Sequence, residues 1–264
     1  MTVSQLFLYP VKSLSGISVD NANMTKRGFR FDRRWMVVNN ENLFMSQRDY
    51  PEMATIKVAI ENDKLRLFTN NERTGVCVPL EPKERKNLKK AKVWQSECEV
   101  VYGFEEANKW LSKQLSTSCE IVYMPEQTHR PVTSELVPEN TIVSFADGYP
   151  YLVIGTASLD DLNGRLKEAI GIERFRPNIV VQTETAFEED AWKRFQLGNV
   201  DFSGVKPCSR CQMINVNPKT AIVENQPLRT LAKYRMEETK IKFGLNALWS
   251  GGKDKLSVGD KFLS

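Results

Sequence analysis

The stretch that indicates the fold class is Thr55-Ile56-Lys57-Val58-Ala59-Ile60-Glu61, in which large apolar side chains occupy every second position. Successive side chains of a β-strand point to opposite faces, so these apolar residues fall on one face. The pattern is typical of an antiparallel strand with one face buried and the other in solvent. Asn62-Asp63 supplies turn residues, and Leu65–Thr69 follows as the second strand of a predicted hairpin.

Similar segments surround this hairpin in the first third of the chain. They are rich in β-branched and aromatic residues and are separated by turn residues such as Asn39-Asn40 and Asn70-Asn71. Short strands joined by hairpin turns predict a barrel or a curled sheet. The predicted strands here are Gln5–Val11, Gly16–Asn21, Arg34–Val38, Leu43–Ser46, Thr55–Glu61 and Leu65–Thr69.

The rest of the chain mixes helices with further strands. Apolar stripes predict helices at Glu105–Leu115 and Leu159–Ile170. The charged stretch Glu81–Lys92 is expected to be a solvated loop or hairpin tip, and Pro125–Glu139 a long loop. The predicted fold class is therefore mainly β with α, an α+β protein. Further predicted elements are strands at Cys119–Tyr123, Tyr151–Ile154, Asn178–Gln182, Val200–Phe202, Gln212–Asn217, Thr220–Val223, Leu245–Trp249 and Leu256–Leu263, and a short helix at Leu228–Arg235.

Composition argues against several classes of protein. The 264 residues include 37 basic and 33 acidic ones, and a formal charge of +4 is too small to predict a nucleic-acid partner. No apolar run reaches the length of a membrane span and no signal sequence is recognisable, so we expect a cytoplasmic protein without a membrane partner. Five cysteines, an odd number, suit a reducing compartment. The single histidine, His129, argues against a histidine-rich metal site.

Chemically reactive side chains concentrate in Lys206-Pro207-Cys208-Ser209-Arg210-Cys211. Thiolates bind soft or high-valent metals, and nearby cations stabilise a thiolate and attract anionic ligands. A structural zinc site would need two more soft ligands, and the other cysteines are isolated in the sequence. A redox-active dithiol normally opens a helix, whereas the apolar pattern of Met213, Ile214 and Val216 favours a strand. Two inert cysteines in a barrel loop fit the sequence equally well.

Several cations and polar groups lie at the ends of predicted elements. Lys12 and Ser13 end the first strand and offer an ammonium and a hydroxyl to a phosphate. Arg33 lies at the start of another strand, and Arg176 and Asn178 would share one face of an extended chain. Each has an ordinary alternative: a strand-end lysine, a surface ion pair and a plain connection between a helix and a strand.

One carboxylate belongs to the same group of candidates. Asp147 opens the turn Asp147-Gly148-Tyr149-Pro150, where it could simply accept a hydrogen bond from its own backbone. Taken together, these candidates lie at element ends, mostly carry positive charge, and could converge on the cysteine pair.

The order and spacing of these motifs resemble the MOSC family, named for the C-terminal domain of molybdenum-cofactor sulfurase. Within it, the chain is most similar to the molybdenum-dependent reductases of the mitochondrial amidoxime-reducing component type and their bacterial relatives. The matching segments are Tyr9-Pro10-Val11-Lys12-Ser13, Asp32-Arg33-Arg34-Trp35-Met36-Val37, Ala157-Ser158-Leu159-Asp160-Asp161-Leu162-Asn163, Phe175-Arg176-Pro177-Asn178-Ile179-Val180, Cys208-Ser209-Arg210-Cys211, Pro227-Leu228-Arg229-Thr230-Leu231 and Val258-Gly259-Asp260.

The resemblance implies two domains and a cofactor between them. Residues 1–118 would form an N-terminal β-barrel-like domain packed against a MOSC β-barrel at residues 119–264, with a pterin-based molybdenum cofactor in the cleft. It also implies that Cys211 binds molybdenum and that Asp147 lies beside the metal. The residues that it assigns to the pterin and its phosphate are Lys12, Ser13, Arg33, Arg176, Asn178, Ser209 and Arg210.

The implied reaction is the two-electron reduction of a small N-hydroxylated compound, such as a hydroxylamine, an amidoxime or an N-oxide, with oxygen leaving as water. The chain carries no cysteine cluster for an iron–sulfur centre, so we expect a separate electron-transfer partner: a ferredoxin-like protein, a flavoprotein or a cytochrome. Pyridoxal phosphate is not expected. Gly148-Tyr149 departs from the hydroxyl-bearing pair that follows this acidic residue in the mitochondrial proteins, which bears on the shape of the substrate pocket.

Two alternatives remain at this point. In one, Cys208 or Cys211 carries a persulfide, activated by Lys206 and Arg210, and the protein is a sulfur carrier or handles the cofactor. In the other, the protein binds a pterin without turnover.

Overall fold

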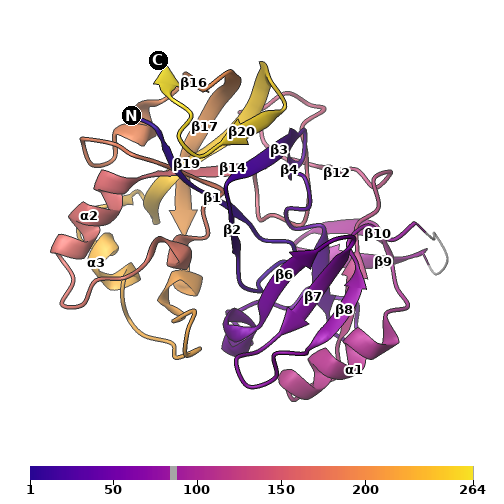
Figure 1. The fold of residues 1–264 in the computed structure, drawn as a ribbon. Helices are drawn as coiled ribbons and strands as arrows, with labels where there is room; N and C mark the ends of the chain where they lie inside the picture. Colours follow the sequence, from indigo (N-terminus) through magenta and orange to yellow (C-terminus); the bar gives the residue numbers. More distant parts are fainter. Residues whose placement is uncertain (84–87, 264) are drawn as a thin grey trace.

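The computed structural model describes residues 1–83 and 88–263 and consists mainly of strands with a few short helices (Figure 1). The predicted mainly β, α+β class is therefore confirmed. Part of the charged stretch predicted at Glu81–Lys92 falls outside the described residues; the part that is described includes the first residues of β9 (Leu88–Val93).

The first body is built around the predicted hairpin. β6 (Lys57–Glu61) and β7 (Lys64–Phe68) pair antiparallel, and β8 (Val76–Pro79) completes their sheet. Leu65 and Leu67 are fully buried, as their alternation with polar neighbours predicts. A second antiparallel sheet has the order β5-β11-β10-β9. Its other strands are β5 (Trp35–Val38), β10 (Ser96–Val101) and β11 (Glu120–Tyr123).

One hydrophobic core joins these sheets to helix α1 (Glu105–Gln114). Ala107, Trp110 and Leu111 form the buried stripe of α1, and Trp35 of β5 packs into the same core. The helix begins with two glutamates and has a lysine in its last turn, so its charges complement the helix dipole. This is the helix that the apolar stripe predicts.

The second body is a long, mostly antiparallel sheet with the order β2-β1-β15-β14-β19-β17-β16-β21. It takes two strands from the beginning of the chain. Both termini lie close together, since Val3 N donates to Asp260 O and Phe262 N donates to Met1 O (Figure 1). Its strands are β1 (Val3–Leu8), β2 (Ile17–Val19), β14 (Tyr151–Gly155), β15 (Ile179–Val181), β16 (Arg194–Leu197), β17 (Val200–Arg210), β19 (Lys240–Gly252) and β21 (Phe262–Leu263).

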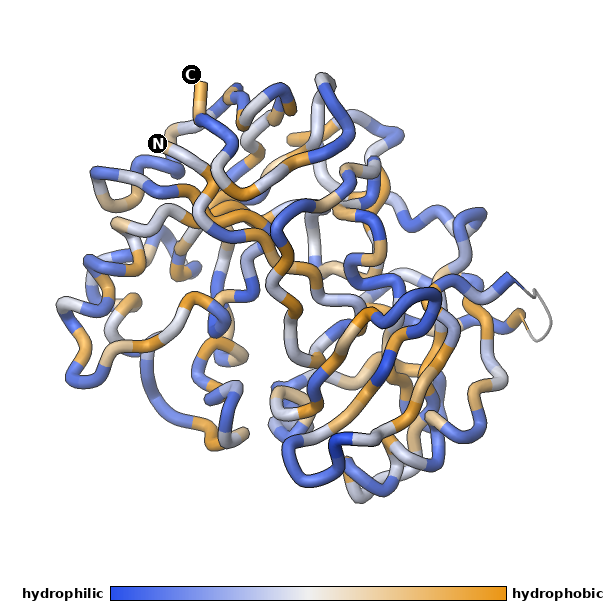
Figure 2. Tube along the Cα trace, viewed as in Figure 1, coloured by the Kyte–Doolittle hydropathy of each residue, from blue (hydrophilic) through white to orange (hydrophobic). Residues whose placement is uncertain are grey.

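Strands from one side of residue 118 pair with strands from the other side in both bodies. β1 pairs with β15, and β3 (Asn21–Thr25) pairs with β20 (Lys255–Ser257), while β11 pairs with β5. The predicted boundary between residues 118 and 119 stays a prediction. In Figure 2 the hydrophobic segments follow the central strands of both bodies, where the cores lie.

The remaining elements are short. Helix α2 (Thr156–Gly164) ends earlier than the predicted helix at Leu159–Ile170, and α3 (Leu228–Ala232) lies within its predicted range. The predicted strands at Leu43–Ser46 and Thr220–Val223 make only isolated bridges. The other elements are strands β4 (Gly28–Phe29), β12 (Arg130–Pro131), β13 (Ile142–Val143) and β18 (Met236–Glu237), and 3-10 helices η1 (Pro51–Thr55), η2 (Ile172–Phe175), η3 (Glu188–Ala191) and η4 (Gln212–Asn215).

The predicted strand at Gln212–Asn217 is wrong, because η4 occupies Gln212–Asn215 and only Val216 makes an isolated bridge. Ile214 N and Val216 N donate to carbonyls three residues earlier, so the backbone of this turn is satisfied locally. Only the end of the segment is bridged to a neighbour, where Val216 pairs with Val223. The apolar pattern after the cysteine pair therefore comes from one turn of helix with Ile214 buried, and the argument that this segment is extended does not hold.

Candidate functional site

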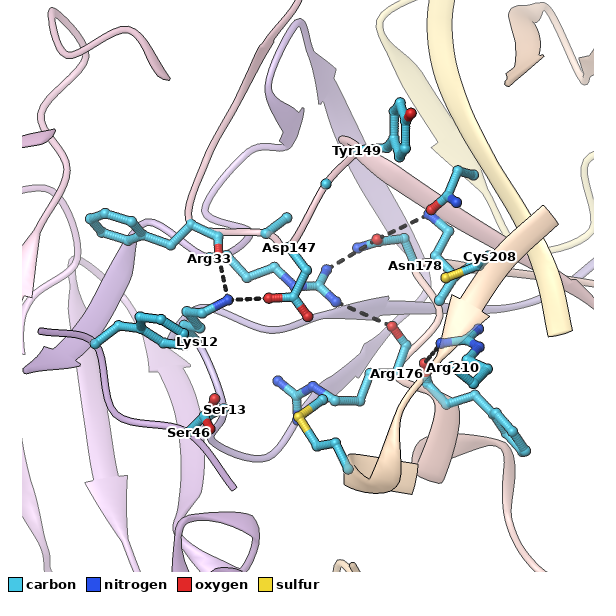
Figure 3. A pocket seen from close by; sticks show the side chains of 18 of the residues that line it. Lys12, Ser13, Arg33, Ser46, Asp147, Tyr149, Arg176, Asn178, Cys208 and Arg210 are labelled. Atoms are coloured by element: carbon cyan, nitrogen blue, oxygen red, sulfur yellow. Dashed lines mark hydrogen bonds and ion pairs between the residues drawn. The ribbon is translucent and has the colours of Figure 1, made fainter. Parts of the chain in front are cut away.

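A cavity between the two bodies gathers most of the predicted site residues (Figure 3). Backbone hydrogen bonds explain why distant segments meet here: Lys12 N donates to Trp35 O, and Arg33 N donates to Tyr9 O. Phe145 N in turn donates to Arg33 O, which brings the Asp147 turn alongside. The predicted residues in the cavity wall are Lys12, Ser13, Arg33, Asp147, Arg176, Asn178 and Arg210.

Lys12 and Asp147 form an ion pair at one side of this cavity (Figure 3). Lys12 is buried, and its Nζ also donates to Phe145 O at 2.9 Å. Burial lowers the pKa of Lys12, and the ion pair opposes that shift. The cavity wall disfavours ionisation of Asp147, but Lys12, the Nε1–H of Trp94 at 3.2 Å and the charge of Arg48 hold its pKa well below the ordinary value. Asp147 is therefore an ionised acceptor.

Two arginines form the cationic floor of the cavity. Arg33 donates to Asn178 Oδ1 at 3.0 Å and to Arg176 O at 3.2 Å, and it pairs with the buried Asp32. The guanidinium carbons of Arg33 and Arg176 lie 4.4 and 4.3 Å from the centroid of the buried Tyr9 ring. Burial, and to a smaller extent repulsion from Arg33, lowers the pKa of Arg176 to about 10. Arg176 therefore remains charged at neutral pH.

Backbone strain marks the same residues. Ser13, Arg33 and Arg176 have φ values of 67°, 48° and 55°, in the left-handed region that side chains rarely adopt. The expectation of an extended chain from Arg176 to Asn178 is therefore wrong, because Arg176 adopts φ 55° and ψ 47°. Both residues nevertheless line the cavity. Strained backbone of this kind is often retained at binding sites.

Most of the cysteine segment, Lys206 to Arg210, lies within a distorted part of β17. The register with β19 shifts between Gly204 and Lys206 and again between Pro207 and Ser209, and such bulges redirect side chains. At Gly204, β17 runs so close to the backbone of Trp192 that an added Cβ would lie 1.8 Å from Trp192 O. The bulges bring the half-buried Cys208 into the cavity wall.

Of the residues that follow Cys208 in this segment, only Arg210 lines the cavity, whereas Ser209 and Cys211 are exposed outside it. Cys211 is exposed, precedes η4, and is not among the residues that line the cavity. Ser209 is also exposed, and its Oγ accepts from Lys242 Nζ at 3.4 Å. Arg210 lines the cavity and donates to Phe243 O and Phe175 O. Within residues 1–83 and 88–263, no group of three or more His, Cys, Asp or Glu side chains is placed to hold a metal ion.

Sequence reasoning missed several residues around this site. Tyr9 lies within a motif that the sequence does single out, but nothing local shows that two arginines pack on its ring. Trp94, Phe44 and Arg48 cluster beside Lys12 because β9 and its neighbours pair across the sheet, which is long-range information. No signal in the sequence identifies these three.

Comparison with known proteins gives the family. The MOSC N-terminal beta barrel domain matches residues 1–118, and the MOSC domain matches residues 140–262. A Mus musculus mitochondrial amidoxime-reducing component 1 is 34% identical over 89% of this chain and 72% of its own length. The chain belongs to the MOSC family. The resemblance expected from the motifs is therefore confirmed.

Other MOSC relatives agree with this assignment. Mitochondrial amidoxime reducing component 2 of Homo sapiens is 33% identical over 89% of this chain and 72% of its own length. Molybdenum cofactor sulfurase of Solanum lycopersicum is 29% identical, over 92% of this chain but only 32% of its own length. A solution structure from Bordetella bronchiseptica is 22% identical and covers 34% of this chain and 71% of its own, with a TM-score of 0.30, too low to support an argument.

None of the described helices is long and apolar enough to cross a membrane.

The cavity of this MOSC chain suits an anionic group. Within the described residues, Arg176 Nη2 and Arg210 Nη2 are buried and have no hydrogen-bond partner, and both side chains line the cavity. A buried donor without a partner is costly, so these nitrogens are available to a ligand oxygen. Among the described residues, five cations line the cavity near two carboxylates, Asp32 and Asp147, and the local charge is therefore positive. The five cations are Lys12, Arg33, Arg48, Arg176 and Arg210.

Proposed function

We propose that this chain binds a pterin-based molybdenum cofactor and reduces N-hydroxylated compounds such as amidoximes and hydroxylamines. The relatives named above are amidoxime-reducing components and a molybdenum cofactor sulfurase, which supports a function associated with that cofactor. The observation that carries the proposal is a pair of buried guanidinium nitrogens, of Arg176 and Arg210, that have no partner among the described residues and lie in a cavity that Cys208 also lines. Guanidinium groups recognise phosphate, and thiolates bind molybdenum-like metals.

The candidate site residues would contact two parts of such a cofactor, its charged phosphate and its neutral pterin. Lys12, Arg33, Arg176 and Arg210 would neutralise the phosphate, and the polar side chains of Ser13, Asn178 and Ser209 would bond pterin edges. Cys211 is the metal ligand that the family resemblance assigns, and its thiol is exposed and free to bind. When bound, the cofactor supplies two-electron redox chemistry.

The protein residues orient the substrate. Reduction of an amidoxime consumes two electrons and two protons and yields an amidine and water. The electrons would come from a separate ferredoxin-like protein, flavoprotein or cytochrome. Asp147 stays ionised because Lys12 and Trp94 hold it, so it accepts hydrogen bonds from the substrate N–H groups and does not act as the proton donor.

The proposal is tested by expression in a host that makes the cofactor, followed by metal and pterin analysis. We expect stoichiometric molybdenum and pterin, and reduction of benzamidoxime with a reduced viologen dye replacing the natural donor. Arg210→Met should lose pterin, because it removes the unpartnered nitrogen, whereas Arg194→Met, on the distant β16, should retain it. Absence of both metal and pterin from the wild type would refute the proposal.

One observation favours a second function, a sulfur carrier. Cys211 is exposed, and a persulfide there could be handed to another protein. Intact mass measured directly after purification would then show one additional sulfur atom that Cys211→Ala lacks. An unmodified thiol together with bound molybdenum excludes this function.

A further inference from the structure

A second, open groove adjoins the cationic cavity between the two bodies. The two share Asp147, Gly148 and Tyr149 in their walls, so this turn separates one from the other. The groove contains about 480 Å³ of space, enough for a substituted aromatic ring. Besides the shared turn, its walls come from the β9–β10 hairpin, from the segment around β12, and from Lys206 on β17.

Two aromatic side chains of this groove are held in fixed positions. Trp94 is 41% exposed, yet its Nε1 donates to Asp147, and the guanidinium of Arg48 lies 4.5 Å from its ring centroid. Tyr149 donates through its hydroxyl to Ser134 Oγ at 3.1 Å. Aromatic faces that are already ordered bind a planar ligand with little loss of side-chain entropy.

The groove also carries unbalanced positive charge. Its charged lining residues are Arg130, Asp147 and Lys206. Asp147 is paired with Lys12, whereas Lys206 and Arg130 form no ion pair with any described residue. Lys206 Nζ lies 5.4 Å from the centroid of the Tyr149 ring, so the cation sits beside the aromatic wall. Arg130 is 6% exposed and bonds backbone carbonyls, and it adds its charge from behind the wall.

Gly148 lies at the junction of the two spaces. A Cβ built at this position would meet no atom within 4 Å, so the absent side chain leaves open space where the groove meets the cavity. A larger residue here would fit without strain in the backbone but would narrow that junction.

We infer that this groove binds the ring to which the N-hydroxylated group of the substrate is attached. We also infer that it selects planar aromatic compounds with an anionic substituent. This inference rests on the proposed function. In it, Trp94 and Tyr149 contact the ring, Lys206 binds the anion, and Asp147 accepts from the N–H groups at the reacting end. Because the two spaces meet at the shared turn, the N–O group reaches the cationic cavity while the ring stays in the groove.

The test compares benzamidoxime with 4-carboxybenzamidoxime, which differ only by a carboxylate. For the wild type we expect kcat/KM to be roughly three- to fivefold higher for the carboxylate at low ionic strength, the usual size of a half-exposed ion pair, and to lose that preference in salt. Lys206→Met should bring the ratio of the two values to about one. Tyr149→Leu should lower both values roughly two- to tenfold, because it removes the aromatic contact.

A glycine pair provides the steric test. Gly148→Val should reduce turnover of both compounds by narrowing the junction, whereas Gly164→Val, at the end of α2, also meets open space and serves as the matched control. Equal kcat/KM for both compounds in the wild type, a preference that survives in Lys206→Met, or full activity of Gly148→Val would overturn the inference.

A binding measurement separates failure of this inference from failure of the proposed function. Titration calorimetry with 4-carboxybenzamidine, the product, requires no turnover and can use the protein with or without cofactor. Binding that Lys206→Met weakens roughly three- to fivefold supports the groove even if no amidoxime is reduced. Binding to neither protein overturns the groove assignment, even if benzamidoxime is reduced.

Discussion

Replacing Tyr9 tests how the cationic floor of the cavity is held. Its ring is 1% exposed and packs against the guanidinium groups of Arg33 and Arg176 at 4.4 and 4.3 Å. A desolvated cation–π contact contributes about 2 kcal/mol. Adding the cost of truncating a buried aromatic side chain, we expect Tyr9→Leu to lower the free energy of unfolding by about 3–5 kcal/mol.

Tyr9→Phe is the matched control. The Tyr9 hydroxyl is buried and has no hydrogen-bond partner in the described part of the chain, and burial raises its pKa, so it stays protonated. Removing it costs no hydrogen bond and relieves a desolvation penalty of about 1–3 kcal/mol. We therefore expect Tyr9→Phe to be as stable as the wild type or more stable.

Urea unfolding of the cofactor-free protein, followed by tryptophan fluorescence, measures both variants. If Tyr9→Phe loses as much stability as Tyr9→Leu, the hydroxyl has a partner and the reasoning is refuted. A loss below about 1 kcal/mol in Tyr9→Leu would show that the arginines do not depend on the ring.

Three further predictions concern the carboxylates and the sheet. The pKa of Asp147 is lowered in the fold, so its ionised form stabilises the protein above the ordinary pKa of about 3.9 and this contribution is lost as the pH falls. Asp147→Asn should therefore flatten the pH dependence of unfolding below about pH 5, and parallel urea curves for both proteins would contradict this. Burial raises the pKa of Glu189, despite hydrogen bonds from Gly155 N and the Ser158 hydroxyl, so stability should fall as the pH rises through that raised value. Glu189→Gln should remove this fall in urea titrations between about pH 4 and 7, and an unchanged slope would count against it. Gly204→Ala should cost about 1–3 kcal/mol in urea unfolding, because its Cβ would meet Trp192 O, and it should lower pterin content; wild-type stability would show that the bulge adjusts freely.

Much of the fold follows from local patterns. The alternation at residues 55–61 and the stripe of α1 each have one period that fits one kind of element, and the structure has both. The pattern after Cys211 was ambiguous, because Met213, Ile214 and Val216 suit a half-buried strand as well as a single turn of helix. Local hydrogen bonds, which the sequence does not reveal, decide between them.

The site was predictable only in part. Lys12, Arg33 and Arg176 lie at element ends, and such ends meet where the two bodies join, so their convergence could be anticipated. The left-handed backbone of Arg176 could not, because it depends on surroundings that over-determine one residue. The same holds for Trp94, whose place beside Asp147 depends on strand pairing across the sheet.

The most direct test of the central proposal is the molybdenum content of three proteins purified from a cofactor-competent host. We predict stoichiometric metal in the wild type, retention in Cys208→Ala, and loss in Cys211→Ala. Metal retained in Cys211→Ala but lost in Cys208→Ala would move the ligand to the cysteine in the cavity wall. A wild type without molybdenum would contradict the proposed function.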